Sequence, residues 1–345
     1  MNREAWRGRR VLVTGHTGFK GAWLGLWLEA LGADVTGLAL EPPTTPSLHA
    51  LLGGTVEPVD IRDRAAVVER ISSVEPEIVF HLAAQSLVRP AFADPVGTYE
   101  VNVAGTASVL EAARRVAATK ADVVVTSDKV YAPHRDGRPY DEDSPLGGVE
   151  PYSSSKACAE LVAAAYRHSY LAGRVATARA GNVIGGGDWA VDRLVPDVVR
   201  ALERSEPVAL RHPQAVRPWQ HVLDPLHGYL LLAERLLDSA EQAPAALNFG
   251  PDPDEACSVS SLVERLSHGF GGRPGWRLAE DGQGVPETAE LRLDASRARA
   301  ELGWAPALGL DEAVKWTVDW HRSHDQGEDV RALTLRQVAA YEERL

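Results

Sequence analysis

Residues 11–21 read Val-Leu-Val-Thr-Gly-His-Thr-Gly-Phe-Lys-Gly, a short apolar run followed by three glycines spaced three residues apart. A helical pattern follows at once, with Trp23, Trp27 and Leu31 at the spacing of a core-facing stripe. In such a unit the first glycine makes a tight turn, the second lets the backbone approach a pyrophosphate, and the third lets helix pack on sheet. The stretch therefore predicts a dinucleotide site at a helix N-terminus.

The composition narrows the classes of partner. The 345 residues include 36 Lys and Arg against 48 Asp and Glu, a net charge of −12, which disfavours nonspecific binding to nucleic acid or an anionic membrane. The two cysteines are too few for a disulfide framework or a cysteine zinc site, and no His, Asp and Glu spacing is typical of a metal centre. No apolar run reaches the roughly eighteen residues of a membrane span, and the N-terminus lacks a signal-like apolar core. We therefore expect a cytoplasmic protein without a metal.

The first half of the chain alternates apolar runs with helical segments. The runs cover residues 10–13, 34–38, 55–59, 78–81, 122–126 and 175–178. This alternation predicts a Rossmann-type α/β fold, a doubly wound parallel sheet with helices on both faces.

The pattern changes after Gly181 into stretches rich in glycine, proline and arginine. Residues 248–250, Asn-Phe-Gly, have the character of a return to the sheet. We expect two regions: a dinucleotide-binding domain and a smaller substrate-binding region. The first comprises residues 1–181 with returning segments near 219–250, and the second comprises 182–218 and 251–345.

Tyr152 and Lys156 are four residues apart, which places them on one face of a helix. An ammonium group beside a phenol lowers the pKa of the phenol. A tyrosine of this kind can take a proton from an alcohol while a nicotinamide takes the hydride. The same spacing is common on surface helices, but its place downstream of a glycine-rich turn favours catalysis.

A second polar group, Ser127-Asp128-Lys129, directly follows the apolar run at 122–126. Its side chains would emerge at the carboxyl end of the sheet, where open α/β sheets bind ligands. A strand-end turn with solvated Asp and Lys is the alternative. A hydroxyl, a carboxyl and an amine together favour chemistry beyond simple alcohol oxidation.

At these residues the chain resembles the extended short-chain dehydrogenase/reductase family, and within it the nucleotide-sugar 4,6-dehydratases, from about Arg9 to Pro306. The members that act on dTDP-glucose carry Thr-Asp-Glu at positions 127–129, whereas the Asp-Lys found here is similar to the subgroup that acts on CDP-glucose. Further matches to that subgroup lie at residues 42–44, 47–48, 151–156, 181–189 and 217–221.

The resemblance implies a three-stage reaction that uses NAD. Tyr152 takes the proton of the sugar 4-hydroxyl as the C4 hydride passes to NAD, with Ser127 bonding the developing carbonyl and Lys156 keeping Tyr152 basic. Lys129 then removes the C5 proton, and Asp128 protonates the departing 6-hydroxyl. The hydride finally returns to C6. An amine must be neutral to act as a base, so Lys129 requires burial or a neighbouring cation, for which Lys156 is a candidate.

The resemblance also implies the cofactor contacts. They are Gly15, His16, Thr17, Gly18, Phe19, Gly21, Asp60, Ile61, Leu82, Ala83 and Ala84, together with Tyr152 and Lys156. Asp60 follows the expected third strand, although an exposed helix start is an equal alternative for this stretch. Residues 37–46 hold no arginine for a 2′-phosphate, which favours NAD over NADP, while Glu41 stands slightly late for the ribose. His16 and His81 are interpreted as lining the cofactor.

For the substrate, the matches imply that Asn182, Arg193 and Arg217 bind the diphosphate, since arginine presents a planar fork to phosphate oxygens. A solvated surface role is favoured for Arg193 but not for Arg217. His221 either contacts the sugar nucleotide or packs in the core. By analogy with relatives, we expect a homodimer formed by the helix after Tyr99 and the helix that starts near Tyr152.

Two segments depart from the subgroup pattern, Asp136-Gly137-Arg138 and Pro286-Glu287-Thr288. Both are expected to border the sugar nucleotide, so another sugar nucleotide or a nucleoside stays open as substrate. An epimerase or a simple dehydrogenase is the alternative activity, and a noncatalytic NAD-binding module is a third. The Asp128-Lys129 pair discriminates against an epimerase, because epimerisation needs no acid for a leaving hydroxyl.

Overall fold

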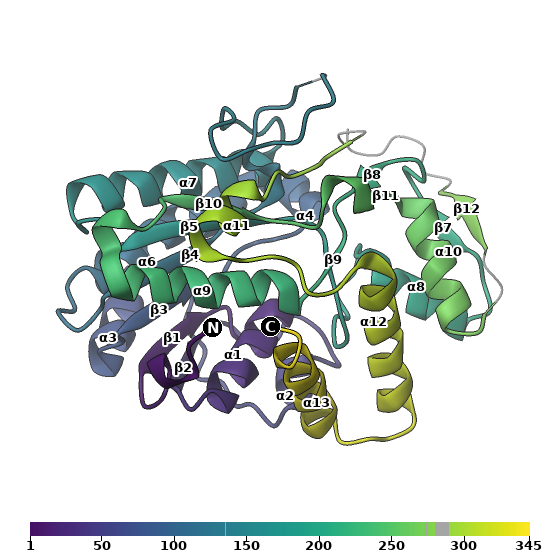
Figure 1. The fold of residues 1–345 in the computed structure, drawn as a ribbon, viewed down its shortest axis with the longest axis horizontal. Helices are drawn as coiled ribbons and strands as arrows, with labels where there is room; N and C mark the ends of the chain where they lie inside the picture. Colours follow the sequence, from purple (N-terminus) through teal and green to yellow (C-terminus); the bar gives the residue numbers. More distant parts are fainter. Residues whose placement is uncertain (135, 273–274, 280–289) are drawn as a thin grey trace.

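The computed structural model describes residues 1–134, 136–272, 275–279 and 290–345. Its centre is a six-stranded sheet with the strand order β2, β1, β3, β4, β5, β10 (Figure 1), in which every pair is parallel. The strands are β1 Arg10–Thr14, β2 Asp34–Leu38, β3 Ile78–His81, β4 Ala121–Val125, β5 Val175–Ala180 and β10 Ala246–Phe249. The predicted fold class is confirmed, and residues 248–249 do return to the sheet.

Helices cover both faces of the sheet, as Figure 1 shows. On one face lie α1 Phe19–Ala30 and α9 Leu223–Ser239, and α13 Val330–Glu342 packs against α1. On the other lie α3 Arg64–Val74, α6 Thr106–Ala113 and α7 Pro151–Ser169. Because successive strand residues point to opposite faces, Val11 and Val13 belong to the first core and Leu12 to the second.

The expected strand at residues 55–59 is wrong. The segment is irregular and largely exposed, and Val59 N donates a backbone hydrogen bond to Ala39 O, just after β2, at 2.8 Å. Pro58 has no N–H to donate to a ladder, and the Glu57 carboxylate pairs with Arg70 on α3. β2 is therefore the edge of the sheet.

Four elements that lie to one side of the sheet (Figure 1) share a smaller apolar cluster. It is built from α8 Leu194–Glu203, β7 Val208–Leu210, α10 Val259–Gly269 and α12 Leu310–Asp325. In the part of the chain that the structure describes, no helix has the length and apolar character needed to cross a membrane.

Short elements connect these parts. They are η1 Arg3–Ala5, α2 Leu48–Leu51, α4 Val88–Ala93, α5 Pro95–Tyr99, the π-helix η2 Glu100–Gly105, η3 Asp128–Val130, β6 Val183–Ile184, β8 Val216–Arg217, β9 Gln220–His221, η4 Ala240–Gln242, η5 Pro253–Glu255, β11 Cys257–Ser258, β12 Trp276–Leu278 and α11 Ser296–Leu302. β6 pairs with β9, β8 with β11, and β7 with β12.

Candidate active site

The glycine turn between β1 and α1 is closely packed. Gly15 has a φ of +72°, and a Cβ there would lie 2.7 Å from Ala83 N. A Cβ on Gly21 would lie 2.2 Å from the Gly15 carbonyl oxygen. α1 begins after Gly18 without a side-chain cap, which leaves its first N–H groups open to an anion. The turn therefore has the shape and polarity that a dinucleotide pyrophosphate requires.

The end of β3 lies against this turn. Leu82 N donates to the Thr14 carbonyl at 3.2 Å, and Ala83 N donates to Thr14 Oγ1 at 3.1 Å. The His81 ring, expected to line the cofactor, is instead held between Thr14 Oγ1 at 2.7 Å and Thr106 Oγ1 at 3.0 Å. Burial lowers its pKa to about 3, so this ring is a neutral link between β1, β3 and α6.

His16 packs edge-on against the ring of His49 with 4.8 Å between centroids, and burial lowers its pKa to about 4. Thr17 Oγ1 donates to the Leu40 carbonyl at 3.0 Å. Both residues thus bind the turn to the segment after β2. They stand beside the place where the adenosine half of a dinucleotide is expected.

Asp60 and Ile61 follow an irregular segment rather than a third strand. Both Asp60 oxygens accept from the Arg62 guanidinium, which holds the pKa of this carboxyl below its usual range. The stretch does end at a helix start, because Asp63 is the N-cap of α3, which begins at Arg64. Ile61 is buried and packs over Gly105.

α7 presents the predicted Tyr152 and Lys156 to the sheet. Glu150 caps the helix by accepting from Tyr152 N and Ser153 N, both at 2.8 Å. Tyr152 and Lys156 are both buried, and Lys156 Nζ donates to the Val125 carbonyl at 3.2 Å. The cap and this bond fix the start of α7 at the end of β4.

Burial dominates the acidity of both groups. It raises the pKa of Tyr152 to about 12, opposed by a hydrogen bond with Ser127. It also lowers the pKa of Lys156 to about 8, opposed by the negative charge of Glu160. The structure differs from the expectation that the ammonium controls the phenol, because desolvation is the largest influence on the pKa of Tyr152.

Ser127 is the N-cap of η3, whose first two residues are Asp128 and Lys129, at the carboxyl end of β4 and against α7. Ser127 Oγ donates to Asp128 Oδ1 at 3.0 Å and accepts from Lys129 N at 3.2 Å. Asp128 is 3% exposed, and its Oδ2 has no hydrogen-bond partner among the described residues. Lys129 is only half-buried. The two predicted motifs therefore lie together.

A buried ion pair that the sequence analysis missed, Glu160 with Arg179, lies next to these motifs. Glu160, one helical turn after Lys156, accepts from Arg179 at 2.8 Å and from Thr177 Oγ1 at 2.7 Å. Thr126, the residue before Ser127, also donates to Glu160. Glu160 continues the Tyr152 and Lys156 face at a spacing of four, and that periodicity is the signal that could have identified it.

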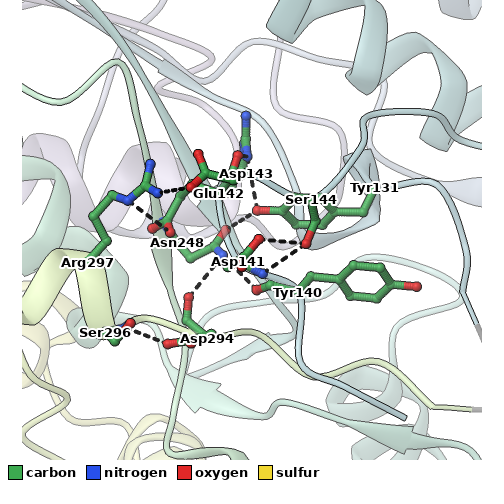
Figure 2. Close-up of polar contacts among 11 residues, drawn as sticks. Tyr131, Tyr140, Asp141, Glu142, Asp143, Ser144, Asn248, Asp294, Ser296 and Arg297 are labelled. Carbon is green, nitrogen blue, oxygen red and sulfur yellow. Dashed lines mark hydrogen bonds and ion pairs between the residues drawn. The ribbon is translucent and has the colours of Figure 1, made fainter. Parts of the chain in front are cut away.

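A second buried network anchors the chain just after η3. Figure 2 shows Tyr131 bonded to Asn248, whose amide group donates to the carbonyls of Tyr140 and Asp294. The Asn248 backbone N–H donates to Glu142, which pairs with Arg297 of α11. The network joins β10, the loop at 140–144 and α11. It fixes the side chain of Tyr131, which follows Lys129 by two residues in the sequence.

Lys20 and Tyr229 also face the site, and the sequence analysis assigned a role to neither. Lys20 Nζ donates to Tyr229 Oη at 3.2 Å, and Tyr152 contributes to the raised pKa of Tyr229. Lys20 stands inside the glycine motif, where a charged side chain before the last glycine was an available signal. The partner of this side chain could not be predicted from the sequence, because Tyr229 is 209 residues away.

Of the predicted substrate residues, Asn182 and Arg193 lie close to the catalytic motifs. The buried Asn182 Oδ1 has no partner among the described residues. Arg193 donates to Ser86 Oγ at 3.1 Å, and its charge lowers the pKa of Tyr152. The Arg193 side chain is 34% exposed at the start of α8, which agrees with the solvated role favoured for it.

Arg217 and His221 are both buried. Arg217 lies on β8, and its guanidinium donates to the Val216 carbonyl at 2.9 Å. His221 is fully buried between the rings of Trp23 and Trp316, and burial lowers its pKa to about 3. This enclosure supports the packing alternative for His221. Asp136 pairs with Arg138 and His134, whereas Pro286-Glu287-Thr288 lie outside the described residues.

The model of the NAD dependent epimerase/dehydratase family matches residues 11–248 of this sequence. The chain belongs to this family. Within the described ranges, no three His, Cys, Asp or Glu side chains gather in a way that could hold a metal ion. The glycine turn, η3 and the start of α7 all lie in the segment that matches the family.

Known proteins are similar in sequence or in fold to this chain over nearly its whole length. CDP-glucose 4,6-dehydratase of Salmonella typhimurium is 44% identical over 99% of this chain and 98% of its own. The Thermus thermophilus UDP-glucose 4-epimerase in complex with NAD is 26% identical with a TM-score of 0.76, covering 91% of this chain and 99% of that one. TunA, an NAD dependent NDP-hexosamine 5,6-dehydratase, is 26% identical with a TM-score of 0.75, covering 93% and 100%.

Proposed function

We propose that this protein is an NAD-dependent 4,6-dehydratase that converts CDP-glucose to CDP-4-keto-6-deoxyglucose. The observation that carries the proposal is the placement of Asp128 and Lys129 beside Ser127, Tyr152 and Lys156 at one end of β4. Oxidation of an alcohol needs only the last three. The additional acid and amine supply what the loss of water requires.

The proposed roles follow from position and chemistry. Tyr152 accepts the proton of the sugar 4-hydroxyl, and Ser127, which hydrogen-bonds the phenol, also bonds the carbonyl oxygen that forms. Lys129 accepts the C5 proton, and Asp128 gives a proton to the departing 6-hydroxyl. NAD, held by the turn at residues 15–21, supplies a hydride acceptor and donor when bound. Lys156 positions the start of α7 through the Val125 carbonyl.

Substrate selection is proposed for the second region. Asn182, Arg193 and Arg217 lie on segments between the sheet domain and the apolar cluster of α8, α10 and α12, and two cations suit a diphosphate. We retain residues 182–218 and 251–345 as the substrate-binding region. α13, at the end of that range, packs on α1 and serves the sheet domain.

The decisive test is product mass. The purified protein is incubated with NAD and a panel of nucleotide hexoses, and products are analysed by mass spectrometry. We expect CDP-glucose to lose one water. A new epimer of unchanged mass would establish an epimerase instead, and loss of water from a different sugar nucleotide or a nucleoside would reassign the substrate.

We further propose a cytoplasmic homodimer. Four large apolar side chains are exposed on α4, α5 and α7, whose neighbouring surfaces form one face: Phe92, Val96, Tyr99 and Leu161. Tyr99 is tied to α7 by a bond from its hydroxyl to Ser154 Oγ at 3.0 Å. Light scattering after gel filtration should give twice the chain mass, and Val96→Asp combined with Leu161→Asp should give a monomer.

A further inference from the structure

The Lys20 side chain extends from the glycine turn to Tyr229 on α9. Its Nζ donates to Tyr229 Oη at 3.2 Å and lies 5.7 Å from the centre of that ring. Tyr229, on α9, is fully buried. Lys20 itself is half-buried and keeps some accessible surface. Its amine is thus fixed at a defined point of the site.

Charged and titratable groups from four other elements face this amine. They are Asp128 of η3, Lys156 of α7, Arg193 at the start of α8, and Tyr229 of α9, which in turn is influenced by Tyr152 of α7. Burial is the largest influence and lowers the pKa of Lys20 to about 7, with repulsion from Arg193 next. Attraction to Asp128 raises this pKa, and repulsion from Lys156 lowers it.

The Asp128 carboxyl is buried, and only one of its two oxygens has a hydrogen-bond partner among the described residues. Its Oδ1 accepts from Ser127, whereas its buried Oδ2 has no partner among the described residues. When this carboxyl gives up a proton, a buried negative charge is created. Such a charge is costly unless a cation or hydrogen-bond donors stand near it.

We propose that Lys20 is a positioning residue for the elimination stage, whose ammonium balances the charge left on Asp128 when that carboxyl protonates the leaving hydroxyl. This inference rests on the proposed function. In the step, the Asp128 O–H bond breaks and its proton joins the sugar 6-oxygen, which leaves as water with the C6–O electron pair. The C5–H electron pair becomes the C5–C6 double bond, and the C5 proton passes to Lys129. Lys20 exchanges no electrons.

The test compares Lys20→Met, Lys20→Arg and the surface control Lys120→Met in single-turnover experiments with NAD and CDP-glucose. Stopped-flow absorbance follows reduced cofactor, and quenched samples follow loss of water. For Lys20→Met we expect oxidation within about threefold of the wild type, elimination slower by roughly 100-fold, and accumulated reduced cofactor. Lys20→Arg should restore elimination, because a guanidinium keeps the charge.

The pH profile separates this role from packing. In the wild type the contribution of Lys20 is present below pH 7 and is lost as the ammonium deprotonates, so elimination should fall on that limb. Arginine stays charged, so the limb should vanish in Lys20→Arg. If Lys20→Met does not fold, the profile of Lys20→Arg alone decides the matter.

The outcomes are distinguishable. Normal elimination by a folded Lys20→Met, or an unchanged pH limb in Lys20→Arg, overturns the role of Lys20 while the dehydratase stands. A wild-type protein that binds CDP-glucose and NAD but never releases water overturns the proposed function, and with it this inference. Lys120→Met must match the wild type, because Lys120 is exposed and remote from the site.

Discussion

At Tyr152 the balance between burial and charge decides the chemistry. Burial is the largest influence and, with the charge of Asp128, raises the pKa of the phenol to about 12. A hydrogen bond with Ser127 and the charge of Arg193 oppose this rise. The phenol is therefore protonated near neutral pH, and the groups that lower its pKa favour its basic form.

Tyr152→Phe removes this proton acceptor and leaves the ring in place. We expect the first oxidation to slow by roughly 10²- to 10⁴-fold, the usual contribution of a positioned acid or base. Stopped-flow absorbance should then show no transient reduced cofactor, whereas the exposed control Tyr170→Phe should behave as wild type. Reduction of bound NAD at the normal rate would remove Tyr152 from its role.

Lys129→Met separates the second stage from the first. The variant should bind NAD and oxidise C4, because Ser127, Tyr152 and Lys156 remain. It should not release water, and the C5 hydrogen should no longer exchange with deuterated solvent, as read by mass spectrometry. In Lys20→Met that exchange should persist, because its C5 base is intact. Full water loss by Lys129→Met would reject Lys129 as the base.

At the scale of elements, backbone requirements were more predictable than side-chain destinations. The glycine spacing predicts the β1–turn–α1 unit, and the structure gives the reason for that spacing. A Cβ at Gly15 or Gly21 would collide with neighbouring backbone. The prediction of a strand at residues 55–59 is wrong, because a short apolar run does not show whether the segment can form backbone hydrogen bonds with the edge strand of the sheet. Pro58 and the pairing of Glu57 with Arg70 removed that segment from the ladder.

Two alanine substitutions on α1 test the glycine turn. Gly21→Ala places a Cβ 2.2 Å from a backbone oxygen, so the turn must shift. We expect loss of NAD binding by calorimetry and a free energy of unfolding lower by about 1–3 kcal/mol. The control Gly25→Ala meets no atom within 4 Å and should raise stability by up to about 1 kcal/mol. Equal NAD affinity in both variants would contradict the assignment of the turn.

For the whole molecule, the sequence predicted the strands of the central sheet, with one extra strand at residues 55–59, and the polar residues that follow β4 at the sheet edge. It did not predict the contacts that tie distant segments to the site. Lys20 with Tyr229, and Glu160 with Arg179, join elements whose proximity depends on the complete fold. Periodicity places Glu160 on the face of Tyr152 and Lys156, but it carries no signal for the partner, Arg179. The His221 ring shows the converse, because this motif position is enclosed between Trp23 and Trp316.

Asp224 ties the C-terminal part to the sheet domain. From α9, its Oδ1 accepts from Tyr341 Oη of α13 and from Ala307 N, both at 2.8 Å. Burial raises its pKa from 3.8 to about 7, opposed by the bond from Ala307. Because the folded state holds this proton more tightly, the stabilisation is complete below about pH 4 and is lost as pH rises through 7.

Asp224→Asn should flatten that dependence. The free energy of unfolding of the wild type, relative to the variant, should fall by up to about 1.4 kcal/mol per pH unit between pH 4 and 7. Urea unfolding at a series of pH values measures both proteins. Asp238→Asn, an exposed change on the same helix, is the matched control and should keep the wild-type slope. A constant difference between wild type and Asp224→Asn at every pH would mean that Asp224 does not take up a proton as the protein folds.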